Sequence, residues 1–153
     1  MAPSELASFA RGLPKAELHL HLEGTLEPDM MFALAQRNGL TLPYSDVAAV
    51  KAAYDFTDLT SFLAVYYPAM GVLQTADDFH DLAWAYLLRA KEQGVVHAEL
   101  FFDPQAHTGR GIPFATVIGG YRRAVVRAQA ELGISAELIL CFLRDLSAEH
   151  AMS

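Results

Sequence analysis

Two histidines separated by one residue, His19 and His21, are the residues whose type and spacing most clearly allow chemistry. Residues two apart on a β-strand point to the same face, so both imidazoles could bind one metal ion through neutral nitrogens. The spacing alone leaves two interpretations open. The pair could be metal ligands that need at least one further ligand, or it could be buried histidines with hydrogen-bond partners inside the protein.

Acidic residues at the ends of predicted strands could contribute to such a site. Glu23 follows the histidine pair on the same face, where it could accept a hydrogen bond from a substrate N–H or cap the following turn. Asp103 ends a second predicted strand, and capping of the Asp103-Pro104-Gln105 loop is the simpler alternative to a ligand contact. His107 lies in the glycine-rich loop that follows and is a further candidate, because functional residues are concentrated in loops.

Other polar residues have simpler expected roles. His97 and Glu99 lie deeper in the second strand, where pairing inside the sheet is expected. Cys141 is expected in the middle of a third strand as a small buried residue. Arg144 and Asp145 end that strand as an ion pair or as part of a pocket rim.

The elements that must position these residues alternate between strand and helix. Val95–Phe102 is almost continuously apolar, as in a strand that is covered on both faces. The alternation predicts a parallel sheet with helical crossovers, an α/β fold that is either a small open sheet or the opening of a barrel. The predicted strands are 16–22, 95–102 and 136–143, and the predicted helices are 29–38, 59–67 (interrupted by Pro68), 75–93 and 114–132.

Composition narrows the class of protein. The 153 residues fit one domain, and the 11 basic and 18 acidic residues give a net charge of −7. No basic cluster exceeds Arg122-Arg123, which argues against nucleic acid as a partner. No secretory signal or apolar run of membrane-spanning length is found, so no membrane partner is expected. The single cysteine favours a reducing compartment, and the cytoplasm is the expected location.

Five segments of the chain form a combined signature: Leu13–Leu26 (LPKAELHLHLEGTL), Phe62-Leu63, Gly94–Val96, Phe101–Pro104 and Phe142–Arg144. Together they resemble the adenosine and adenine deaminases, metal-dependent purine deaminases of the amidohydrolase superfamily. The resemblance covers essentially the whole chain. Residues 22–26 and 102–108 are most similar to the adenine deaminase branch, because the adenosine enzymes more often carry a small hydroxyl residue where Asp103 stands.

The resemblance implies a fold and a set of site residues. The fold is a (β/α)8 TIM-type barrel, with this chain supplying the first three strands and with helices between Ser45 and Gly94 covering the mouth. Residues 1–153 would then be the N-terminal part of a single metal-dependent hydrolase domain. The implied zinc ligands are His19 and His21, and the implied substrate-binding residues are Glu23, Phe62, Leu63 and Asp103.

The implied reaction is the hydrolytic loss of the C6 amine of adenine, which yields hypoxanthine and ammonia in purine salvage. One Zn²⁺ per complete subunit, a small purine substrate and a possible homo-oligomer accompany it. The family's third histidine ligand and its general acid correspond to positions beyond Ser153, so no catalytic residue is expected within this chain. Asp145 stands where many relatives have histidine. The alternatives are an adenosine deaminase, a half-enzyme completed by a second chain, and a non-catalytic half-barrel that binds a metal or a partner.

Overall fold

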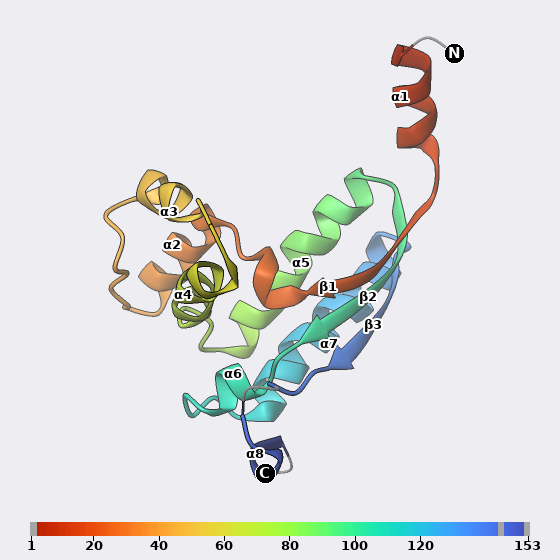
Figure 1. The fold of residues 1–153 in the computed structure, drawn as a ribbon. Helices are drawn as coiled ribbons and strands as arrows, with labels where there is room; N and C mark the ends of the chain where they lie inside the picture. Colours follow the sequence, from red (N-terminus) through yellow and green to blue (C-terminus); the bar gives the residue numbers. More distant parts are fainter. Residues whose placement is uncertain (1–2, 144–145, 152–153) are drawn as a thin grey trace.

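The computed structural model describes residues 3–143 and 146–151 and shows three strands with helices between them (Figure 1). The strand predicted at 95–102 has the predicted bounds, and the elements predicted at 16–22, 29–38, 75–93 and 114–132 differ from the prediction by one residue at each affected end. In chain order the elements are α1 (Pro3–Gly12), β1 (Lys15–His21), the 3-10 turn η1 (Leu22–Thr25), α2 (Pro28–Arg37), α3 (Val47–Ala53), α4 (Leu59–Met70), α5 (Ala76–Glu92), β2 (Val95–Phe102), α6 (Gln105–Thr108), α7 (Phe114–Glu131), β3 (Ser135–Leu140) and α8 (Ala148–Ala151).

The sheet is parallel, with the strand order β1-β2-β3. His21 pairs with Phe101, and Phe101 pairs with Ile139 across the sheet. Because the strands are parallel, their carboxyl ends lie at the same edge. The predicted α/β class is therefore confirmed, and the residues that follow β1, β2 and β3 are brought together.

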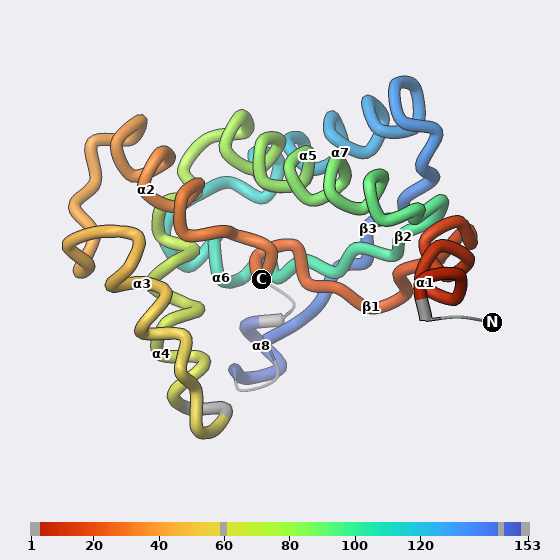
Figure 2. The backbone as a smooth tube through the Cα atoms, turned by 90° about the horizontal axis from the view of Figure 1, so that it is seen from above, coloured from red at the N-terminus to blue at the C-terminus, as the bar shows by residue number. Residues whose placement is uncertain are grey.

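One face of the sheet is covered by α5 and α7, which lie side by side (Figure 2). A capping box at Thr75 starts α5, and the buried stripe of Phe79, Leu82 and Leu87 follows at helical spacing. A Cβ atom added at Gly120 of α7 would lie 2.4 Å from the carbonyl oxygen of Ala76. The absence of a side chain at Gly120 therefore allows the two helices to approach closely.

The opposite face of the sheet is not covered by helices in the described part of the chain, which corrects the expectation from the apolar β2 sequence. In β2 the buried residues Ala98, Leu100 and Phe102 alternate with the partly exposed His97 and Phe101. Each strand pairs with the next one in sequence, so right-handed crossovers place both connecting helices on the same side. This arrangement is that of a barrel wall rather than of a doubly wound open sheet.

Two further boundaries differ from the prediction. Pro68 does not end α4, which continues to Met70. The proline removes one backbone hydrogen bond of the helix, and the N–H groups of Gly71 and Val72 close the last turn on the carbonyl oxygens of Pro68 and Ala69. The strand β3 ends at Leu140 rather than at residue 143, so Cys141 follows the strand and is partly exposed. The expected pair Arg144 and Asp145 lies outside the described residues.

Asp78 joins α2 to the start of α5. Its side chain is fully buried, and Oδ1 accepts a hydrogen bond of 3.0 Å from Arg37. Oδ2 accepts bonds from the Asn38 side chain (2.9 Å) and from the backbone N–H groups of Gln74 (3.0 Å) and Thr75 (2.8 Å). Both oxygens therefore have partners, and the carboxylate holds the end of α2 against the start of α5.

None of the helices within residues 3–143 and 146–151 is both long enough and apolar enough to span a membrane.

Candidate active site

The histidine pair lies at the carboxyl end of β1, and both rings stack on Phe101 of β2. The ring centroids of His19 and His21 lie 4.4 and 5.5 Å from that of Phe101 and 5.7 Å from each other. The predicted placement of both imidazoles on one face is therefore confirmed. His19 is exposed and His21 is partly buried, so both rings remain accessible from the uncovered side of the sheet.

Asp103 binds His21. Its Oδ2 lies 3.0 Å from His21 Nδ1, and the aspartate is almost completely buried. Burial and the nearby Glu23 raise the pKa of Asp103, while the contact with His21 opposes that increase. When the carboxylate accepts the bond from Nδ1–H, the lone pair of the imidazole resides on Nε2. The alternative role of Asp103, a cap of the loop that follows it, is not observed. The N-cap position of α6 is Pro104, and no side chain caps that helix.

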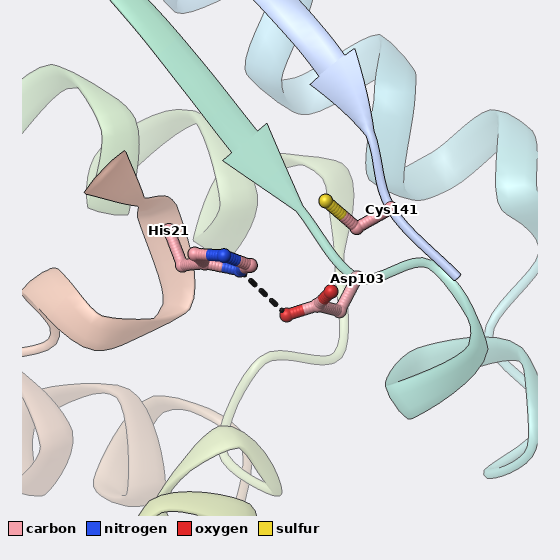
Figure 3. A group of neighbouring side chains, drawn as sticks. All are labelled: His21, Asp103 and Cys141. Carbon is pink, nitrogen blue, oxygen red and sulfur yellow. Dashed lines mark hydrogen bonds and ion pairs between the residues drawn. The ribbon is translucent and has the colours of Figure 1, made fainter. Parts of the chain in front are cut away.

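A donor set suited to a metal surrounds this contact (Figure 3). One ligand atom from each of His21, Asp103 and Cys141 lies within 4.8 Å of the other two. Imidazole nitrogen, carboxylate oxygen and thiolate sulfur are the ligand types that zinc takes in proteins. The residues present therefore fit a zinc ion, with His19 beside them on the same face. Sequence reasoning did not place Cys141 near His21 and Asp103, because its position there depends on β3 ending at Leu140.

Glu23 lies in η1, directly after the histidine pair, and its side chain is buried at 2% exposure. Its Oε1 accepts hydrogen bonds from the Asp103 N–H (3.2 Å), from His107 Nε2 (3.1 Å) and from the Tyr121 hydroxyl (3.3 Å). The side chain therefore does not cap the turn, which was one of the two alternatives. It connects the end of β1 to the end of β2 and to α7.

His107 was a weaker candidate in the sequence, and the structure places it inside this network. Both His107 and Glu23 are fully buried at their side chains. An Nη2–H of Arg110 donates to His107 Nδ1 at 3.0 Å, so the ring proton resides on Nε2, and Nε2–H donates to Glu23. Arg110 is anchored in turn by the carbonyl oxygens of Met70 and Leu73. An arginine three residues after a loop histidine was the only local signal for this arrangement.

A cavity of about 200 Å³ adjoins Glu23. Phe62 lines it, and its ring stacks on Tyr66 with a centroid distance of 5.1 Å and meets the edge of Phe56 at 5.2 Å. Burial raises the pKa of Tyr66 far above its ordinary value, so its hydroxyl stays protonated. Leu63 is partly buried and is not among the lining residues. The cavity combines aromatic walls with two acidic residues, the buried Glu23 and the exposed Glu27, a composition that suits a flat, partly polar ligand.

Comparison with known proteins agrees with this geometry. Residues 14–153 match the family model described as adenosine deaminase. The chain is 61% identical over 141 residues to an adenine deaminase of Trichlorobacter lovleyi and 60% identical over 146 residues to one of Rhodospirillum rubrum. These alignments cover 92% and 95% of this chain, and 40% and 44% of the relatives.

Solved structures give the same result. An adenine deaminase from Arthrobacter aurescens superposes with a TM-score of 0.89 at 52% identity, over 90% of this chain and 42% of that one. A Burkholderia ambifaria amidohydrolase with bound Zn superposes with a TM-score of 0.81 at 32% identity, over 94% and 40% of the two chains. The chain thus spans less than half the length of the relatives it matches.

Proposed function

The chain belongs to the adenosine deaminase family, and on that premise we propose that it forms the N-terminal part of an adenine deaminase. Residues 1–153 contribute the first three strands of a single barrel domain that hydrolyses adenine to hypoxanthine and ammonia. The observation that carries the proposal is the junction at Glu23, where the His21–Asp103 pair meets an aromatic cavity. The similarity to adenine deaminases at about 60% identity supports the choice of substrate.

The metal of this site is proposed to be zinc, held in this chain by His19 and His21. The two imidazoles on one face, with Asp103 behind His21, support it, as does the bound Zn of the Burkholderia relative. When bound, zinc supplies a Lewis acid that lowers the pKa of a water ligand from about 15.7 to about 7.

The residues of this chain have separable tasks in that reaction. Asp103 holds His21 Nδ1 and thereby directs Nε2 toward the metal, as carboxylates do behind ligating histidines. Phe62 provides a flat apolar wall for the purine ring, and Glu23 provides a hydrogen-bond acceptor. Leu63 is proposed to contribute apolar surface nearby. The general acid and the remaining ligands are proposed to come from outside residues 1–153.

The proposed setting is purine salvage in the cytoplasm, which the single cysteine among 153 residues supports.

Ammonia release from adenine by the full-length deaminase that contains this chain tests the proposal. We expect adenine to be turned over far better than adenosine; the reverse preference would make the protein an adenosine deaminase instead. Zinc content measured in the same preparations tests the metal site. His19→Ala and His21→Ala should lose zinc and activity, whereas His150→Ala, at an exposed position of α8, should retain both.

A further inference from the structure

The two oxygens of the Glu23 carboxylate have opposite environments. Oε1 accepts from three donors, the N–H of Asp103, Nε2–H of His107 and the hydroxyl of Tyr121. Oε2 is equally buried, yet within residues 3–143 and 146–151 no donor lies within hydrogen-bonding distance of it. Buried acceptors are almost always paired, so an orphaned oxygen in a natural protein points to a partner supplied from elsewhere.

The partner can be located because Glu23 also lines the aromatic cavity with Phe62 and Tyr66. The other acidic residue of the cavity, Glu27, is exposed and paired with Arg89, so Glu23 is the buried acceptor next to which a flat ligand between those walls would lie. A carboxylate only accepts hydrogen bonds, so the matching ligand group must be a donor. An unsubstituted purine carries one N–H on its imidazole ring, whereas the same ring in a nucleoside carries the sugar in place of that hydrogen.

The donors to Oε1 explain why Oε2 stays available. Arg110 fixes the tautomer of His107, so His107 can only donate toward Glu23 and cannot compete for the ligand's hydrogen. Tyr121 is almost completely buried, and burial keeps its pKa well above the ordinary value, so its hydroxyl also remains a donor. Together these groups hold the carboxylate in one orientation.

We propose that Glu23 Oε2 accepts the imidazole-ring N–H of a free purine base, and that His107 and Tyr121 are positioning residues that reserve this oxygen for it. The inference rests on the proposed function and specifies its substrate class as purines without a substituent on that nitrogen. Discrimination against nucleosides then comes from an unpaired buried acceptor as well as from the bulk of the sugar.

The test compares adenine with 9-methyladenine in the full-length deaminase and in its Glu23→Gln variant. Glutamine keeps the shape of the side chain but presents an N–H₂ group in place of Oε2. The value of kcat/KM for adenine should fall about 10- to 100-fold, the equivalent of one hydrogen bond to a charged acceptor, and the value for 9-methyladenine should change less than about threefold. Equal losses for both purines, as expected if water satisfies Oε2, would overturn the proposal.

A second variant tests the positioning role without removing the carboxylate. Tyr121→Phe should raise KM for adenine several-fold with little change in kcat, and it should leave 9-methyladenine unaffected. Tyr86→Phe, which removes a tyrosine hydroxyl from α5 outside the network, is the matched control and should behave as wild type. A Tyr121→Phe variant that lowers kcat alone, or that affects both purines alike, would contradict the role.

Failure of the proposed function would look different. In that case the wild-type protein would release no ammonia from any purine. Calorimetric binding of hypoxanthine and 9-methylhypoxanthine to wild type and Glu23→Gln then still measures the hydrogen bond. Loss of hypoxanthine binding alone in the variant would support the proposal, and unchanged binding of both would overturn it.

Discussion

Asp78 and Glu23 are two buried carboxylates with contrasting surroundings. Both oxygens of Asp78 are paired, with donors from α2, from the loop before α5 and from the start of α5. Glu23 has three donors on one oxygen and none among the described residues on the other. A fully satisfied buried acid stabilises the fold, whereas a half-satisfied one retains binding capacity at a cost in stability. The contrast separates a structural acid from the acid that we propose binds the substrate.

Replacement of Asp78 should have the largest effect on stability. Asp78→Asn places an amide N–H₂ group against existing donors, and we expect the free energy of unfolding to fall by about 3 kcal/mol. Urea denaturation measures the change. Asp77→Asn, at the neighbouring exposed position on the same helix, should change stability much less. Similar losses for the two variants would mean that Asp78 is not a special structural acid.

The close packing of α5 against α7 should be the next most sensitive feature. It connects the two acids, because α5 carries Asp78 and α7 carries Tyr121, which donates a hydrogen bond to Glu23. In Gly120→Ala the new methyl group would lie 2.4 Å from the Ala76 oxygen and 2.6 Å from Phe79 Cβ. We expect a loss of about 1–3 kcal/mol from this overpacking. Gly119→Ala has no atom within 4 Å of its new methyl and should instead stabilise the helix by about 0.5–1 kcal/mol. Thermal melts of the pair give the sign of each effect.

Acid should weaken the contribution of Asp78. Burial alone would raise the pKa of Asp78, but hydrogen bonds from Gln74, Asn38 and Thr75 outweigh it and hold the pKa below its ordinary value of 3.8. A group with a lowered pKa stabilises the fold above its ordinary pKa, and that contribution is lost as pH falls through the value in the folded state. The stability difference between wild type and Asp78→Asn should therefore shrink as the pH falls below 3.8, as followed by urea denaturation. A constant difference would show that ionisation is not involved.

The smallest effect on stability is expected at Glu23. Glu23→Gln removes a buried charge with one orphaned oxygen while it keeps an acceptor for the donors of Oε1, so unfolding should change by less than about 1 kcal/mol. The same substitution should reduce the preference for adenine over 9-methyladenine. A loss as large as that for Asp78→Asn would remove the distinction between the two acids.

Local sequence patterns were sufficient for most of the fold. The alternation around His19 and His21 predicted a strand with both rings on one face, and the capping residues near Thr75 predicted α5. The error on sheet coverage had a physical cause: a long apolar strand looks the same whether its second face meets helices or other strands. The extent of β3 also could not be read, because apolar residues continue to Leu143 after the strand has ended.

The site was less predictable than the fold. Glu23 and Asp103 were identified as candidates, but their contacts join residues about 80 positions apart in the chain. The role of His107 depends on Arg110, which is itself held by carbonyl groups at the end of α4 and beyond it. No local pattern encodes such a chain of contacts, so only the folded arrangement shows that His107 is a donor to Glu23.

The strand order β1-β2-β3 predicts the order in which the strands pair during folding. Paired residues of β2 and β3 are about 40 positions apart in the chain, and those of β1 and β2 are about 80 apart. Each doubling of loop length adds about 0.6 kcal/mol to the entropic cost of closure, so the unit from β2 through α7 to β3 is expected to form first. His21 of β1 then joins Asp103, and Glu23 joins His107, in a late step. A protein trapped before that step would have native helices but would lack both contacts.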